Sequence, residues 1–151
     1  MLFTLLNERS FQKMMNRHIT DTLFYLLDND QPFGLLCNLK YVTFDPPLPE
    51  DIYSALNDVT LFMIAGYTFE SFSVEDDFLF FEAGFGSQNF GSLVSMPLLA
   101  ILQLLVEETP ILINMAQPIT NFEIEDEKDS GIKNSLENFL NNPENRKFLK
   151  K

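Results

Sequence analysis

Hydrophobic positions near the start of the chain recur at helical spacing. From Ser10 to about Asp28, apolar side chains fall at intervals of three and four, which places them on one face of a helix. Most charged and amide side chains fall on other faces. The sequence Asn29-Asp30-Gln31-Pro32 then ends the pattern, because proline disfavours helix at the residue before it. The pattern predicts one amphipathic helix over residues 10–28.

After Gly34 the pattern changes to the partial alternation of half-buried strands. Pro97 suits the first turn of a second helix, predicted over residues 98–108. The predicted fold class is α+β: an N-terminal helix packed on a small antiparallel β-sandwich or barrel with a second helix. The other predicted elements are strands over residues 35–42, 59–67, 68–74, 78–85, 93–96 and 111–115 and a short helical turn within 50–57.

The composition changes after Gln117. Residues 123–129 are rich in Asp and Glu and contain few apolar residues, which predicts a disordered acidic linker. The chain then ends in a basic segment with two bulky apolar residues, Phe148 and Leu149, a composition typical of a short linear motif. The predicted organisation is an N-terminal extension (1–9), a folded domain (10–117), an acidic flexible linker (118–144) and a terminal motif (145–151).

Charge and cysteine content exclude several classes of protein. The net charge of −12 opposes binding to nucleic acid, which depends on Lys and Arg neutralising phosphates, and it opposes anionic membrane surfaces. Cys37 is the only cysteine, so neither an intrachain disulfide nor a cysteine zinc site is expected. The first ten residues lack a basic region and a small-residue cleavage site, so they are not expected to be a signal peptide, and Glu107 and Glu108 interrupt the longest apolar stretch. We expect a soluble cytoplasmic protein.

Residues for catalysis are hard to assemble. The only histidine, His18, lies on the apolar stripe of the first helix, and Cys37 lies in a predicted strand. As a nucleophile and base, this pair would lack a third, orienting residue. The carboxylates of residues 75–77 lack the spacing of a calcium loop, and no glycine-rich phosphate loop is present. The sequence predicts a protein that is not an enzyme and has no metal and no cofactor.

Two alanines in predicted strands indicate a different kind of site. Alternation places Ala65 on one face with Met63 and Tyr67, and Ala83 on one face with Phe81 and Phe85. A small residue between large apolar ones can form a slot that a foreign backbone approaches closely. The same pattern also suits ordinary core positions, and these residues alone leave both interpretations open.

The order of short motifs resembles the stringent starvation protein B (SspB) family. Leu26-Leu27-Asp28-Asn29 matches the LLDN that closes the family's first helix. The segments 64–65 and 81–86 resemble its IA and FNARFGG segments, and Val94-Ser95-Met96-Pro97 resembles its VSVP segment. The resemblance covers residues 14–118, about two thirds of the chain. The chain departs from the family pattern at two places. Gly84 replaces the arginine that is common in the family's FNARF segment, and the hairpin over residues 86–93 is longer than the family's hairpin.

The resemblance implies an adaptor for the ClpXP protease. It implies an Sm-like β domain whose N-terminal helix pairs two subunits, a groove that captures the ssrA degradation tag, and a tail that docks on the ClpX N-terminal domain. The implied groove residues are Leu36, Asn38, Met63, Ala65, Tyr67, Phe81, Ala83 and Phe85. Those implied at the dimer interface are Met14, His18 and Thr22, and those implied in ClpX docking are Arg146, Lys147, Phe148 and Leu149.

Three other functions remain as alternatives. A holdase-like or assembly protein would bind unfolded chains without preference for a tag. A hydrolase using Cys37 and His18 would lose turnover in a Cys37→Ser variant. An Sm-like RNA-binding protein would show steep dependence on salt, which the negative charge of the chain opposes.

Overall fold

One long helix, α2, runs over Arg9–Asp28 and confirms the predicted N-terminal helix. The computed structural model describes residues 2–118, and a short helix, α1 (Leu2–Leu6), precedes α2. The side chains that α2 buries recur at intervals of four, four and three: Met15, Ile19, Leu23 and Leu26. Its end is closed by backbone hydrogen bonds from Asn29 to Tyr25 and from Gln31 to Leu26.

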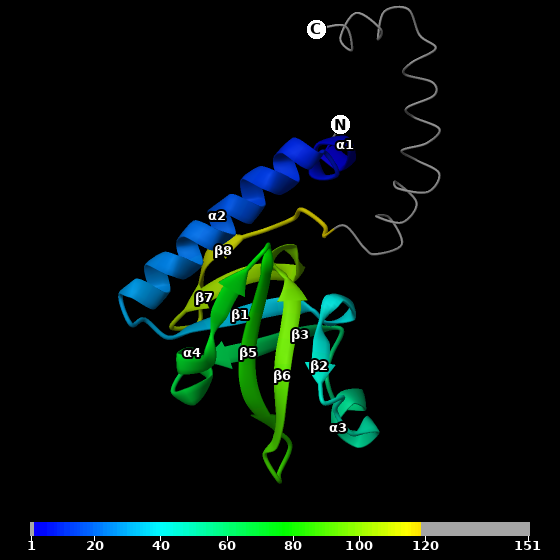
Figure 1. Cartoon of the computed structure of the whole chain (residues 1–151). Helices are drawn as coiled ribbons and strands as arrows, with labels where there is room; N and C mark the ends of the chain where they lie inside the picture. The colour runs from blue at the N-terminus through cyan, green and yellow to red at the C-terminus, as the bar shows by residue number, and fades with distance from the viewer. Residues whose placement is uncertain (1, 119–151) are drawn as a thin grey trace, which may run out of the picture. The chain divides into compact units, whose positions relative to one another are not determined.

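Two antiparallel sheets of four strands, with short helices between some of the strands, follow α2 (Figure 1). The first, sheet A, has the order β3-β1-β7-β8, with β1 at Phe33–Asn38, β3 at Val59–Ile64, β7 at Ile101–Val106 and β8 at Thr109–Ile113. The second, sheet B, has the order β2-β6-β5-β4, with β2 at Thr43–Asp45, β4 at Ser73–Glu75, β5 at Phe78–Phe85 and β6 at Phe90–Pro97. Within residues 2–118 the sheets do not close into a barrel.

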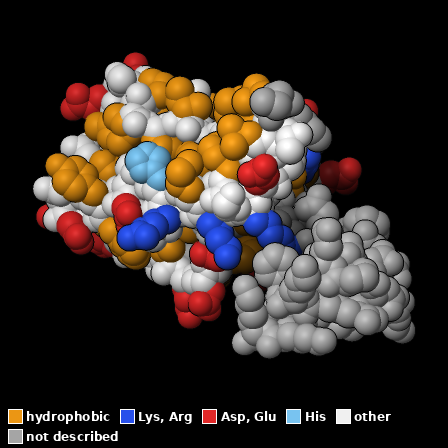
Figure 2. Space-filling model, turned by 90° about the horizontal axis from the view of Figure 1, so that it is seen from above, with side chains coloured by type: hydrophobic (Ala, Val, Ile, Leu, Met, Phe, Trp, Pro, Cys, Tyr) orange, Lys and Arg blue, Asp and Glu red, His pale blue; other side chains and the backbone are white. Residues whose placement is uncertain are grey.

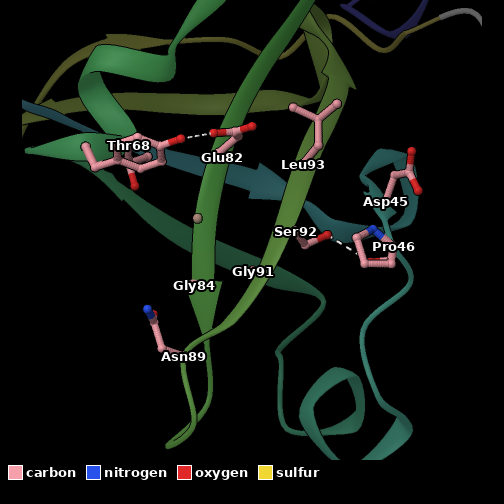
Figure 3. Close-up of a pocket in the computed structure, with 11 residues that line it drawn as sticks. Asp45, Pro46, Thr68, Glu82, Gly84, Asn89, Gly91, Ser92 and Leu93 are labelled. Carbon is pink, nitrogen blue, oxygen red and sulfur yellow. Dashed lines mark hydrogen bonds between the residues drawn. The ribbon is translucent and has the colours of Figure 1, made fainter.

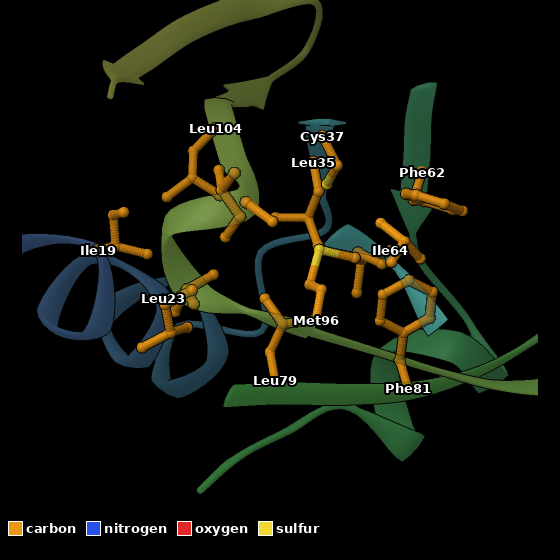
Figure 4. Packing of buried hydrophobic residues seen from close by; sticks show 14 of the residues in the cluster. Ile19, Leu23, Leu35, Cys37, Phe62, Ile64, Leu79, Phe81, Met96 and Leu104 are labelled. Atoms are coloured by element: carbon orange, nitrogen blue, oxygen red, sulfur yellow. The ribbon is translucent and has the colours of Figure 1, made fainter. Parts of the chain in front are cut away.

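The inner faces of the two sheets pack against each other through aromatic side chains. The ring centroid of Phe62 on sheet A lies 5.5 Å from that of Phe81 on sheet B, and the ring of Phe44 on sheet B lies tilted against Phe62 with centroids 6.4 Å apart. Figure 4 shows Ile19 and Leu23 of α2 beside this same core. Fully buried large side chains contribute most to stability, because removing the apolar surface of each one from water stabilises the fold by about 1.5–3 kcal/mol. The helix and both sheets therefore share one core.

The predicted second helix over residues 98–108 is wrong. Leu98–Ala100 form a single 3-10 turn, and β7 follows directly. Leu98, Leu99 and Ala100 and then Ile101 and Leu104 are buried, so this apolar run continues the core rather than covering it. A short continuous apolar run fits a buried strand as well as a buried helix, and periodicity alone does not separate them.

The predicted strand over residues 68–74 is also wrong in its first part. Helix α4 spans Tyr67–Ser71, and only Ser73–Glu75 form a strand. The break comes at Gly66, whose φ of 58° turns the chain out of β3. The predicted strand over 35–42 is likewise divided, because a 3-10 turn at Leu39–Tyr41 separates β1 from β2. The predicted helical turn is present as α3 (Glu50–Ser54).

The predicted acidic linker and terminal motif lie outside the described residues. Among residues 2–118, no helix is both long enough and apolar enough to cross a membrane.

Candidate functional site

An open pocket of about 530 Å³ lies on the outer face of sheet B (Figure 3). The strand register arranges its floor in two rows. Gly84 faces Gly91 across the β5–β6 ladder, and in the next row on this face Glu82 and Asp45 both pair with Leu93. We call this the β5–β6 pocket; it is lined by Asp45, Pro46, Tyr67, Thr68, Glu82, Ala83, Gly84, Asn89, Gly91, Ser92 and Leu93.

The paired glycines make the floor hollow. A Cβ atom built on Gly91 would meet no other atom within 4 Å, so this position opens directly into the pocket. A Cβ atom on Gly84 would overlap the side chain of Asn89, which lies over that glycine. Asn89 reaches this place because the hairpin loop turns back at Gly86 and Asn89, both with positive φ. The floor is thus bare backbone partly covered by one amide side chain.

The wall on the α4 side carries an anchored carboxylate. The hydroxyl of Tyr67 donates a hydrogen bond to the carboxylate of Glu82, and this bond raises the pKa of Tyr67. The backbone N–H of Glu82 donates to the hydroxyl of Ser71 at 2.9 Å. Because Tyr67 and Ser71 are the two ends of α4, the helix holds Glu82 at the rim of the pocket.

The opposite wall comes from the end of β2. Asp45 pairs with Leu93, and the chain continues through Pro46, whose carbonyl accepts a hydrogen bond of 2.9 Å from the hydroxyl of Ser92. Ser92 is buried, so this bond satisfies its hydroxyl and fixes the Pro46 segment beside β6. The pocket is therefore held between two anchored walls.

One edge of β5 beside the pocket has no strand partner. β6 pairs with the whole of β5, but β4 pairs only with Phe78, Leu79 and Phe80. In the part of the chain that the structure describes, no strand pairs with the other edge of residues 81–85. Exposed strand edges offer N–H and C=O groups to an incoming extended chain. Ser71 of α4 already accepts the backbone N–H of Glu82, so within residues 2–118 the part of this edge left without a partner is residues 83–85, next to the β5–β6 pocket.

A second pocket, of about 680 Å³, lies at the tip of the same hairpin. Phe85 and Phe90, which face each other across the ladder, line it together with Ile52 and Leu56 from the α3 segment. These four side chains are half-buried. The hairpin-tip pocket suits an apolar side chain, whereas the β5–β6 pocket has a polar rim.

The eight residues predicted for a groove do not come together at one place. Tyr67 and Ala83 line the β5–β6 pocket, and Phe85 lines the hairpin-tip pocket. Phe81 does not fit a groove wall, because its side chain is fully buried between the sheets. The other predicted residues lie outside both pockets: Leu36, Asn38 and Met63 on sheet A, and Ala65 between β3 and α4.

Those three sheet A residues belong to its outer face, which exposes apolar side chains. The register places Leu36 opposite Leu61 and Gly34 opposite Met63, and Asn38 faces Val59. On the far edge strand, Ile113 pairs with Gln103. Met63 and Ile113 are each 63% exposed. A face of this kind is typical of a surface that contacts other molecules.

The residues predicted for a dimer interface lie along the outer side of α2. Met14 and His18 are exposed, and Thr22 is half-buried with its hydroxyl donating to the His18 carbonyl. Tyr25 continues this stripe at 68% exposure. Figure 2 shows hydrophobic side chains on both sides of the single histidine, with Lys and Arg side chains along one border.

Cys37 and His18 do not have the properties of a nucleophile and its base. The Cys37 side chain is fully buried in the core, and burial raises the pKa of its thiol, which disfavours the reactive thiolate. His18 lies on the exposed side of α2. Among residues 2–118, no three His, Cys, Asp or Glu side chains are grouped so that they would hold a metal ion.

No model of a known protein family matches the chain, and no curated protein matches it significantly. The likeness to SspB therefore rests on the short motifs in the sequence.

Proposed function

We propose that this chain is a non-enzymatic adaptor that binds an ssrA-type degradation tag and tethers the tagged protein to the ClpX unfoldase of ClpXP. The observation that carries the proposal is the hollow over Gly84 and Gly91 beside the unpaired edge of β5. A bare backbone floor next to a free strand edge accommodates an extended peptide main chain. Side chains of the peptide enter the β5–β6 pocket and the hairpin-tip pocket.

Ala83 has a central place in this arrangement. It lies between Glu82 and Gly84, on the segment of β5 that has no second strand partner, and it lines the β5–β6 pocket. Its methyl group lies on the inner face of sheet B with those of Phe81 and Phe85 and packs against the core, so Ala83 offers a peptide its backbone at this edge. This agrees with the position of Ala83 in the motif that resembles SspB.

The mechanism is tethering. The groove holds the tag weakly, and the terminal residues Arg146, Lys147, Phe148 and Leu149 bind the ClpX N-terminal domain. Two weak contacts joined by a linker raise the effective concentration of the substrate at the unfoldase to roughly millimolar values. The chain itself makes and breaks no bond, so all chemistry belongs to the protease.

The adaptor acts as a homodimer that pairs through α2. The exposed side chains of Met14 and Tyr25 give two helices an apolar contact, with His18 and Thr22 between them, and a dimer supplies two tails to one unfoldase. Sedimentation analysis is expected to give a mass of twice 17.4 kDa for the protein and a monomer for Met14→Asp. A monomeric unmodified protein would contradict this part of the proposal.

The peptide specificity is tested by fluorescence anisotropy. A labelled ssrA-type peptide is titrated with the full chain, beside a scrambled peptide of the same composition and an Ala83→Gln variant. We expect saturable binding of the tag that both the scramble and the variant lose. Equal binding of both peptides would exclude recognition of the tag.

A holdase-like function is the second candidate, because the outer face of sheet A exposes Leu61, Met63 and Ile113. Apolar faces bind unfolded chains with little preference for sequence. The scrambled peptide separates the two candidates, since a holdase binds it as well as it binds the tag.

A further inference from the structure

The charges around the β5–β6 pocket are all of one sign. Asp45 and Glu82 flank Leu93 in one row across sheet B. Neighbouring strands lie about 4.8 Å apart, so the backbones of the two acidic residues are separated by roughly 10 Å, with Leu93 between them. Both residues are exposed. The pocket thus has a carboxylate on each side of an apolar centre.

Positive charge is absent from the lining of this pocket. Residues 2–118 contain four Lys and Arg residues against fifteen Asp and Glu residues. Arg9, Lys13 and Arg17 lie on α2, and Lys40 lies over the ring of Tyr41, 5.0 Å from its centre. Every basic residue in the part of the chain that the structure describes is therefore on another element, and an anionic ligand would find no counter-charge in the pocket.

We propose that the β5–β6 pocket selects peptides that carry a cationic side chain, Lys or Arg, at the position that enters it. Leu93, which is 39% exposed, contacts the aliphatic stem of that side chain. The charged end lies between the carboxylates of Asp45 and Glu82. Tyr67 keeps Glu82 in place through its hydrogen bond, so the side chain meets a fixed carboxylate.

This inference rests on the proposed peptide-binding function and adds the class of peptide. A free amino terminus has the same charge as a lysine side chain and is the other possible source of the cation. Leu93 favours the side chain, because an amino terminus brings no long apolar stem to cover it.

The test is a scan of the labelled ssrA-type peptide against the full chain. Lys, Gln or Glu is placed singly at each position, and each peptide is measured with a free and with an acetylated amino terminus. At one position, we expect Lys to bind about fivefold to tenfold more tightly than Gln, and Glu to bind more weakly than Gln. The preference should shrink as salt rises, because these charges are exposed. It should be the same for acetylated peptides.

Glu82→Gln locates the effect, and Glu75→Gln is its matched control. Glu75 is an exposed carboxylate on the same sheet, at the far end of the β4–β5 ladder and outside the pocket. We expect Glu82→Gln to reduce the preference for Lys at least threefold and Glu75→Gln to leave it unchanged. Equal binding of the Lys, Gln and Glu peptides overturns the inference while leaving the groove in place. Weaker binding of every acetylated peptide, with no preference for Lys at any position, assigns the pocket to an amino terminus and overturns the inference too. If none of the peptides binds, both the proposed peptide-binding function and this inference are overturned.

Discussion

Replacing Gly91 by valine is expected to weaken binding of the ssrA-type peptide roughly tenfold or more, with little change in the stability of the domain. Valine suits a strand, and its Cβ meets no atom of the protein within 4 Å at this position. Its two methyl groups instead occupy the hollow that a peptide would enter. A tenfold loss corresponds to about 1.4 kcal/mol of binding free energy.

The matched control for Gly91→Val is Ser73→Val. Ser73 is also an exposed residue of sheet B, but it lies on β4 and lines neither pocket. Anisotropy titrations give the affinity of each variant, and thermal unfolding shows whether each is folded. A folded Gly91→Val variant that binds the tag as tightly as the unmodified protein would rule out the hollow as the binding site.

Ending the chain at Asn145 is expected to abolish delivery of a tagged protein to ClpXP while leaving the affinity for the tag unchanged. The deletion removes Arg146, Lys147, Phe148 and Leu149 and leaves all residues of the folded domain. Without a second contact, the gain from tethering is lost, and such gains reach about 10²–10⁴-fold. The measurement is the rate of degradation of an ssrA-tagged protein at a concentration too low for ClpXP to bind it unaided.

A chain ending at Leu149 is the control for this deletion, because it lacks only the last two lysines. It should deliver the tagged protein nearly as well as the full chain. Full delivery by the chain ending at Asn145 would show that the terminal residues do not dock on ClpX.

The elements with strong and unambiguous periodicity were predictable from the sequence. Helix α2 was predictable because its apolar spacing holds over the whole length of the helix. Strand β5 was predictable because the Glu75-Asp76-Asp77 turn and the hairpin glycines define both its ends. Strand β7 was not, since its apolar run carries no periodic signal that separates strand from helix. The boundary between β3 and α4 depends on the positive φ of Gly66, which the pattern of side chains does not show.

The pocket was predictable only in part. Alternation correctly placed Ala83 on one face with Phe81, but that face is the inner one, where Phe81 is fully buried and Ala83 packs against the core. Gly84 and Gly91 were missed as a site because a hollow is made by missing side chains. A signal for them does exist: the turn Gly86-Ser87-Gln88-Asn89 sets Phe85 opposite Phe90, and Gly84 then faces Gly91. Reading the hairpin register from its loop would have paired the two glycines.

The most direct test of the proposed function is to locate the peptide on the folded protein. Amide chemical shifts of the labelled protein are followed by NMR while the unlabelled ssrA-type peptide is added. We expect the largest changes at Glu82, Gly84 and Gly91, with smaller ones at Tyr67. Changes confined to Leu61, Met63 and Ile113 on the outer face of sheet A, or no changes at all, would contradict it.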